Sequence, residues 1–119
     1  MSILKSGSKK DVQEIEPKDA FIEIEKHRDD PDFVILDVRT PDEYSEEHLE
    51  NAHLLDVRSK EFEDELEKMD KNKKYFVYCK AGLRGCRAVD LMQAHGYKDV
   101  HNIKGGIDKW KSKRLPVTT

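Results

Sequence analysis

Short apolar runs alternate along the chain with segments in which apolar residues recur every three or four positions. The runs FVILDV at residues 33–38 and YFVYC at residues 75–79 contain almost no polar side chain. Such runs are typical of strands that are buried on both faces of a parallel sheet. Between them, the apolar positions of residues 59–69 share one face of an amphipathic helix.

The two patterns together define a fold class. Strands that alternate with helices at this spacing form βαβ units. The prediction is therefore an α/β fold with a central, mostly parallel sheet of about five strands and with helices on both faces. The predicted strands cover residues 12–15, 33–38, 52–57, 75–79 and 99–103, and the predicted helices begin at Pro17, Pro41, Ser59, Arg84 and Gly105.

Local signals mark the ends of several of these helices. Thr40 precedes Pro41, and Glu43 stands three residues after Thr40, which is the pattern of a capping box. Ser59 is predicted to cap the next helix, and Gly96 to end the helix that follows it. The predicted boundaries therefore depend on side-chain chemistry as well as on periodicity.

Composition and charge narrow the classes of protein. The 119 residues carry 22 basic and 25 acidic side chains, and the net charge of −3 gives no reason to expect nucleic acid or a membrane as partner. Two cysteines do not make a disulfide framework, and no apolar run approaches membrane-spanning length. Residues 1–10 lack the apolar region of a signal peptide and are predicted to be a flexible tail. Residues 11–119 are expected to form one domain in a reducing cytoplasm.

Cys79 stands at the end of a predicted strand, directly before a glycine-containing loop and a helix. This cysteine can be core packing, because cysteine is among the most buried residue types. The loop favours a second interpretation, since Gly82 and Gly85 allow N–H groups to turn inward and the helix directs its positive end at the same place. Lys80 and Arg84 add positive charges that can attract a small anion. These surroundings favour the thiolate, which is the nucleophilic form of cysteine.

Two known chemistries use a cysteine that is cradled by a loop of this kind. In phosphate-ester hydrolysis the cysteine and an arginine are separated by five residues, whereas four residues separate Cys79 from Arg84. The shorter loop leaves less room for a tetrahedral phosphate, while a terminal sulfane sulfur is smaller and fits a shorter ring of N–H groups. The spacing therefore favours sulfur transfer over a phosphatase or an arsenate reductase.

Three segments, in the same order, resemble the signatures of the single-domain rhodanese family. ILDVRTPDEYSEEHLENAHLLD, residues 35–56, is similar to a signature in which Asp-Val-Arg is followed by Glu-Tyr and by Gly-His-Ile-Pro-Gly-Ala. YCKAGLRG, residues 78–85, is similar to the active-site loop Cys-x-x-Gly-x-Arg-Ser, and GYKDVHNIKGGIDKW, residues 96–110, to the closing segment of the family. The resemblance covers nearly the whole chain after the tail and implies the rhodanese-like fold.

The resemblance also implies a sulfurtransferase. Cys79 would take a sulfane sulfur from a donor such as thiosulfate or a persulfide, and would pass it to cyanide or another thiol. Arg84 would orient the loop or the anionic donor, and no metal or organic cofactor is implied. The loop that the resemblance expects to hold the persulfide consists of Lys80, Ala81, Gly82, Leu83, Arg84 and Gly85.

The chain departs from the family pattern at four positions. Glu47 and Asn51 stand where glycines are usual, and Glu50 replaces a proline. Gly85 replaces the serine that usually follows the loop arginine. These changes leave the nucleophile and the loop length intact, and they bear on donor specificity and on the rigidity of the loop.

Further residues are candidates for supporting roles. Asp37 is interpreted as structural, held by backbone N–H groups or by an arginine, and Arg39 lies two residues further on. His48 could act as a base but is interpreted as a hydrogen-bonding residue that links neighbouring loops. Cys86 is expected to be a partly exposed ordinary thiol, and the alternative is a resolving cysteine that attacks an oxidised Cys79. The histidines lack zinc-ligand spacing with a cysteine pair, so no metal site is predicted.

The expected partners follow from this reading of the loop. They are a small sulfur-containing anion or a persulfide as donor, a thiol or cyanide as acceptor, and a sulfur-relay protein. The alternative to an enzyme is a rhodanese-like regulatory or sulfur-carrier module that does not turn over thiosulfate itself. The basic loop favours activity, because an inert module needs no positive cradle.

Overall fold

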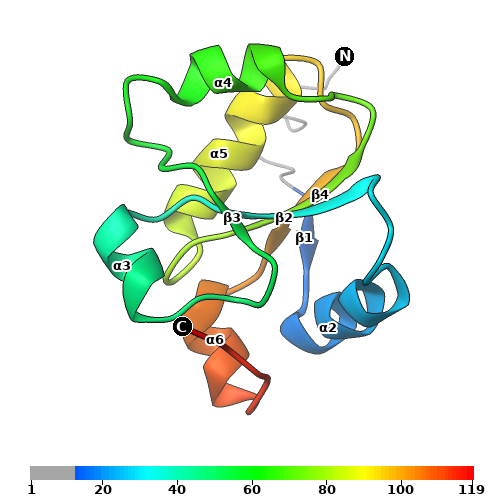
Figure 1. Ribbon diagram of the computed structural model, residues 1–119, viewed down its shortest axis with the longest axis vertical. Helices are drawn as coiled ribbons and strands as arrows, with labels where there is room; N and C mark the ends of the chain where they lie inside the picture. Colours follow the sequence, from blue (N-terminus) through cyan, green and yellow to red (C-terminus); the bar gives the residue numbers. More distant parts are fainter. Residues whose placement is uncertain (1–12) are drawn as a thin grey trace, which may run out of the picture.

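The computed structural model describes residues 13–119, which form a five-stranded sheet with helices on both sides (Figure 1). The predicted tail at residues 1–10 and the predicted start of the domain at residue 11 lie outside the described residues. The elements are β1 Glu14–Ile15, α2 Pro17–Lys26, β2 Phe33–Asp37, α3 Pro41–Glu46, β3 His53–Leu54, α4 Phe62–Lys68, β4 Lys74–Tyr78, α5 Leu83–Ala94, β5 Val100–Ile103 and α6 Gly106–Ser112.

The strands pair in the order β1-β5-β4-β2-β3, and all these pairings are parallel. The predicted α/β class is therefore confirmed. The register of β2 with β4 runs from Phe33 opposite Lys74 to Asp37 opposite Tyr78. Asp37 ends β2 and Cys79 directly follows β4, so both reach the edge where the carboxyl ends of the strands meet. Sites in parallel sheets lie beyond this edge.

Successive residues of β4 point to opposite faces of the sheet, as in any strand. Val77 and Cys79 belong to the core that includes residues of α4 and α5, whereas Phe76 and Tyr78 belong to the core that includes residues of α2 and α6. Figure 1 shows α4 and α5 on one side of the sheet and α2 and α6 on the other. Trp110 is buried on the α2 and α6 side. The candidate nucleophile therefore lies on the α5 side of the sheet.

The predicted capping box at the start of α3 is confirmed. The Thr40 hydroxyl accepts the N–H of Glu43 at 3.3 Å, and the Glu43 carboxylate accepts the N–H of Thr40 at 3.0 Å. Pro41 and Pro17 stand at the starts of α3 and α2, as predicted. Gly96 follows α5 with a φ of 97°, a left-handed conformation that suits a residue after a helix end.

The strand predicted at residues 52–57 is shorter than expected. Only His53–Leu54 pairs as a strand, because the chain turns soon afterwards. The Asp56 carboxylate accepts the N–H of Arg58 at 2.9 Å, which is the hydrogen bond of an Asx turn. The N–H groups of Leu55 and Val57 still donate to the carbonyls of Asp37 and Val38, at 2.8 Å and 3.2 Å, but these bonds do not extend the strand.

The prediction that Ser59 caps α4 is wrong. The Ser59 hydroxyl accepts the N–H of Glu61, two residues further on, at 3.0 Å. This bond makes a local turn that competes with helix capping, and α4 begins only at Phe62. Within residues 13–119, each helix is too short or too polar to cross a membrane.

Candidate functional site

The Cys79 sulfur accepts two backbone hydrogen bonds directly after β4. The N–H groups of Gly82 and Gly85 donate to Sγ at 3.0 Å and 3.1 Å. Gly82 is the N-cap of α5 and Gly85 lies in its first turn, so the positive end of the helix is directed at the sulfur. Amides in this arrangement stabilise negative charge on sulfur, in a thiolate or in a persulfide. Because Cys79 is only 1% exposed, only a small group can reach its sulfur unless the loop side chains move.

Two glycines shape the loop around this sulfur. Gly82 has a φ of 115°, a left-handed conformation that residues with a Cβ rarely adopt. A Cβ at Gly85 would lie 2.1 Å from Oδ1 of Asn102, and Nδ2 of Asn102 donates to the Gly82 carbonyl at 3.3 Å. The position of Asn102 therefore leaves no room for a side chain at position 85, where glycine replaces the usual serine.

The start of α6 holds the loop backbone. The N–H of Ile107 donates to the Cys79 carbonyl at 2.8 Å, and the N–H of Asp108 donates to the Lys80 carbonyl at 3.0 Å. The first N–H groups of a helix have no partner within it, so the loop satisfies them. Gly106 permits this approach, because its φ is 63° and a Cβ there would lie 2.4 Å from both carbonyl oxygens. The sequence correctly predicted a helix start at this glycine pair, but not its contact with the loop.

Both cations of the loop are paired with carboxylates. Arg84 donates from Nη1 and Nη2 to the two carboxylate oxygens of Glu43 at 2.7 Å and 3.0 Å. Lys80 donates to both carboxylate oxygens of Asp108 at 3.0 Å and 3.1 Å. The sequence indicated these two charges but not their partners, because each charge meets an acidic side chain from a distant part of the sequence. The contact of Arg84 anchors the loop to α3.

Glu43 has a strongly altered ionisation. The pKa of Glu43 is lowered from 4.5 to about 2, chiefly by the hydrogen bonds from Arg84, while partial burial acts in the opposite direction. Bonds from the backbone and side chain of Thr40 contribute to the same lowering. The same pairing raises the pKa of Arg84. Both groups therefore remain charged over the whole range of physiological pH.

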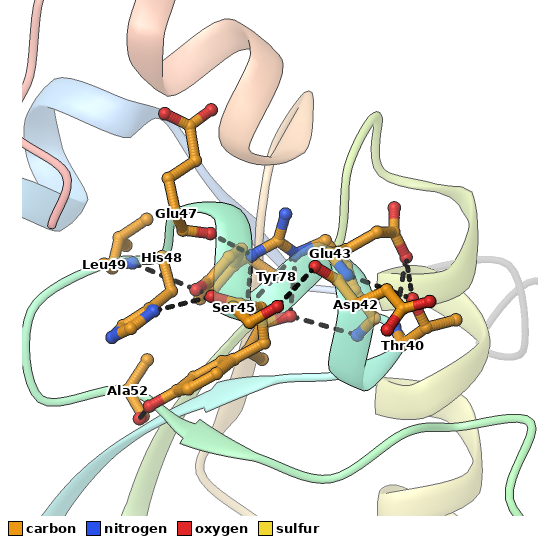
Figure 2. A network of polar contacts seen from close by, with 12 residues as sticks. Thr40, Asp42, Glu43, Ser45, Glu47, His48, Leu49, Ala52 and Tyr78 are labelled. Carbon is orange, nitrogen blue, oxygen red and sulfur yellow. Dashed lines mark hydrogen bonds and ion pairs between the residues drawn. The ribbon is translucent and has the colours of Figure 1, made fainter. Parts of the chain in front are cut away.

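A buried network lies beside the loop on the α2 and α6 side of the sheet. Asp37 is fully buried and accepts from Nε and Nη2 of Arg39 at 2.9 Å and 2.7 Å. The Tyr78 hydroxyl donates to Asp37 at 2.7 Å and accepts the N–H of Leu49 at 3.1 Å, and Figure 2 shows Tyr78 and Leu49 together. Burial, and then the charge of Asp37, raise the pKa of Tyr78. Asp37 and Arg39 therefore form a buried ion pair.

His48 joins α3 to the end of the chain. Its Nδ1 donates to the Tyr44 carbonyl at 2.8 Å, and its ring stacks on the Tyr44 ring at 3.8 Å. The backbone groups of His48 and Thr118 exchange two hydrogen bonds of 2.8 Å. The neighbouring Glu47 carbonyl accepts Nη2 of Arg39 at 2.7 Å, so His48 and the buried network belong to one connected region (Figure 2). These contacts give His48 a linking position.

Cys86 is half-buried on α5 and its sulfur has different neighbours from that of Cys79. Nδ2 of Asn102 lies 3.3 Å from the Cys86 sulfur, and a Glu14 carboxylate oxygen lies 3.6 Å from it. Burial, followed by the charge of Glu14, raises the pKa of the Cys86 thiol. Both cysteines are free. The partial exposure expected for Cys86 is what the structure shows.

Over residues 13–119, no three His, Cys, Asp or Glu side chains gather as a group that could hold a metal ion.

Sequence reasoning missed several groups that shape this site. Of the missed groups, only two gave a signal in the sequence, the glycine that begins α6 and the acidic residue of the capping box. The missed roles are those of Glu43, Tyr78, Asn102, Gly106 and Asp108.

Comparison with known proteins agrees with the fold. The model of a family described as the Rhodanese-like domain matches residues 21–113. The chain therefore belongs to the rhodanese-like family. The matched range contains Cys79, its loop and the first part of α6 that supports it.

Individual relatives are similar to most of the chain. The chain is 39% identical over 82 residues to the thiosulfate sulfurtransferase GlpE of Coxiella burnetii, which covers 68% of this chain and 74% of that protein. It is 34% identical over 105 residues to a tRNA uridine(34) hydroxylase of Erwinia tasmaniensis, covering 80% of this chain but 29% of that protein. A rhodanese-related protein of Thermoplasma volcanium has a TM-score of 0.76 at 25% identity, covering 89% and 97% of the two chains. Because relatives with different names share this domain, the reaction has to be argued from the site.

Proposed function

We propose that the chain is a sulfurtransferase that carries a sulfane sulfur on Cys79. The observation that carries the proposal is the pair of N–H groups, from Gly82 and Gly85, that donate to the Cys79 sulfur. They stabilise a negative sulfur at the start of a helix, and a persulfide needs the same stabilisation. The similarity to a thiosulfate sulfurtransferase supports the same reaction class.

The reaction has two half-reactions. In the first, the Cys79 thiolate attacks the outer sulfur of the donor, so that a bond forms between Sγ and this atom. The sulfur–sulfur bond of the donor breaks, and its electron pair leaves with sulfite from thiosulfate, or with a thiolate from a persulfide. In the second, cyanide or an acceptor thiolate attacks the outer sulfur and regenerates the Cys79 thiolate. The electron pairs balance without a metal or an organic cofactor.

A sulfur-relay module is the second candidate, and it is favoured by the pairing of both loop cations with carboxylates, which weakens the attraction for a small anionic donor. Such a module would carry the persulfide and hand it to a protein partner, but would not turn over thiosulfate with cyanide. The phosphatase alternative has less support. The N–H groups of the short loop donate to the cysteine sulfur itself, at 3.0 Å and 3.1 Å, whereas a phosphatase loop has to surround a whole phosphate group. Multiple turnover in the presence of cyanide separates the enzyme from the relay module.

Mass spectrometry of the intact protein tests the proposal. After incubation with excess thiosulfate or cysteine persulfide, the protein should gain one sulfur atom, about 32 Da, on Cys79, as thiolate chemistry requires. Cyanide should remove this sulfur and release thiocyanate. Cys79→Ser should gain no sulfur at the site while keeping its fold, and Cys86→Ser should behave as the unmodified protein does. A protein that takes sulfur on Cys79 from neither donor would not be a sulfurtransferase.

A further inference from the structure

Resting on the proposed function, we propose that Cys79 takes its sulfur from an organic persulfide, R–S–SH, in preference to the thiosulfate dianion, and that Glu43 and Asp108 set this preference. The loop sequence contains two cations, Lys80 and Arg84. In the folded chain each is bound to one of the two carboxylates. The local charge around Cys79 therefore differs from the charge that the loop sequence alone indicates.

Glu43 is held so that a donor anion cannot readily displace it. Both of its oxygens bind Arg84, and one of them also accepts the N–H and the hydroxyl of Thr40. Bidentate ion pairs between arginine and a carboxylate are among the stronger charge-assisted hydrogen bonds. The side chains of Arg84 and Glu43 are 18% and 26% exposed, so water screens the pair only in part. Thiosulfate would have to compete with this fixed carboxylate for the guanidinium.

Asp108 neutralises the second cation from the other side of the loop. It binds the Lys80 ammonium through its side chain, and its own N–H donates to the Lys80 carbonyl at 3.0 Å. The side chains of this pair are 59% and 50% exposed, so the pair is weaker than that of Arg84. The backbone bond nevertheless keeps the carboxylate beside the loop.

The neutralised loop affects the two donors differently. With thiosulfate, the Cys79 thiolate approaches a dianion and expels sulfite, which is again a dianion. With a persulfide, the bond from Sγ to the outer sulfur forms and the sulfur–sulfur bond of the donor breaks. The electron pair leaves on R–S⁻, a thiolate with a single charge, while the proton stays on the transferred sulfur. A site without net positive charge attracts thiosulfate and sulfite only weakly. The persulfide reaction involves less negative charge and therefore needs less positive charge at the site.

The surface next to the loop also fits an organic donor. Leu83, the first residue of α5, is 85% exposed and directly follows Gly82. Among residues 13–119, only Leu83 and Ile22 are large apolar side chains that are mostly exposed. An apolar side chain at the rim can pack against the carbon atoms of an R group, whereas thiosulfate has no such atoms. Leu83 therefore adds a contact that favours the persulfide.

The test measures the rate of sulfur addition to Cys79 by mass spectrometry, in a Cys86→Ser background. Thiosulfate and cysteine persulfide are the two donors, and each rate is divided by the rate at which the same donor reacts with free mercaptoethanol. The normalised rate with cysteine persulfide should exceed that with thiosulfate by roughly tenfold or more, from the missing attraction for a dianion. Glu43→Gln and Asp108→Asn should each raise the thiosulfate rate roughly three- to tenfold and leave the persulfide rate within about twofold.

Glu46→Gln is the matched control, because Glu46 is an exposed residue of the same helix as Glu43 and its loss changes the net charge equally. It should leave both rates unchanged. The inference is overturned if the normalised thiosulfate rate equals or exceeds the persulfide rate, or if Glu43→Gln and Asp108→Asn act no differently from Glu46→Gln. Failure of both donors to add sulfur would instead overturn the proposed function itself, and this inference with it.

Discussion

Glu43 and Arg84 lie 41 residues apart in the sequence and form a two-point ion pair between α3 and the first turn of α5. The pair exists only in the folded chain, because no local structure brings these residues together. It ties the helix that directs its amides at Cys79 to the capping box of the β2–α3 unit. A change in the charge of Glu43 therefore acts on stability and on the site.

The stability of the protein should depend on pH through this pair. Folding lowers the pKa of Glu43 from 4.5 to about 2, so the ionised form stabilises the fold. This contribution is fully present above about pH 5 and is lost as the pH falls toward about 2. The free energy of unfolding of Glu43→Gln, measured in urea, should be lower than that of the unmodified protein by roughly 1–2 kcal/mol at neutral pH.

The difference between these two proteins should shrink when the measurement is repeated at about pH 3, because Glu43 then takes up a proton in the unfolded chain, where its pKa is near 4.5, but stays mostly ionised in the folded protein. Glu46→Gln is again the control and should show no such change. An equal difference between the unmodified protein and Glu43→Gln at both pH values would contradict the assigned pairing.

Tyr78→Phe should destabilise the protein by roughly 1–3 kcal/mol, the cost of leaving buried polar groups without a partner. The hydroxyl serves two buried partners, the Asp37 carboxylate and the N–H of Leu49. Tyr75→Phe is a suitable comparison, because the Tyr75 hydroxyl donates to the single carbonyl of Asp70 at 2.6 Å. Thermal or urea unfolding should show the larger loss for Tyr78→Phe, and equal losses would count against the importance of the Asp37 network.

Gly106→Ala should abolish sulfur addition to Cys79. Its Cβ would lie 2.4 Å from the carbonyl oxygens of Cys79 and Lys80, so α6 and the loop would have to separate. Gly96→Ala is the matched control, since Gly96 also has a positive φ, of 97°, but a Cβ there would meet only a Lys71 side-chain carbon at 3.7 Å. Backbone strain alone should cost Gly96→Ala about 1 kcal/mol of stability and leave sulfur addition intact. Loss of the reaction in both variants, or in neither, would show that the contact of α6 with the loop is not what matters.

Mild peroxide should not produce a disulfide between Cys79 and Cys86. The Cys86 sulfur lies beside the Glu14 carboxylate, and burial together with this charge raises the pKa of its thiol, so little thiolate is present to attack. Titration of free thiols should show the same loss per Cys79 in the unmodified protein and in Cys86→Ser. Loss of two thiols per molecule in the unmodified protein alone would establish a resolving role for Cys86.

The parts of the structure that sequence reasoning predicted are those determined locally. The apolar run before Cys79 specifies β4, and Thr40 with Glu43 specifies the start of α3, because each depends on residues within a few positions. The two loop glycines likewise indicated amides around the sulfur, and Gly82 and Gly85 supply them. Ser59 shows the limit of such signals, since a serine can form a turn as well as a helix cap.

The parts that could not be predicted depend on residues brought together by the sheet. The β4–β5 pairing places Asn102 within hydrogen-bond distance of the Gly82 carbonyl, and the start of α6 brings Asp108 to Lys80. The sequence showed the two cations of the loop but not the carboxylates that bind them, because Glu43 and Asp108 come from other βα units. Asn51 is an intermediate case, since its φ of 67° agrees with the glycine that is usual at this position.

The contact between α6 and the backbone of Cys79 has a consequence for synthesis of the chain. A ribosome makes the strand that carries the thiol well before it makes Gly106, Ile107 and Asp108. Until these residues emerge, the carbonyls of Cys79 and Lys80 lack their N–H partners. A nascent or proteolysed chain that stops before α6 would therefore carry the thiol without the helix that supports its loop.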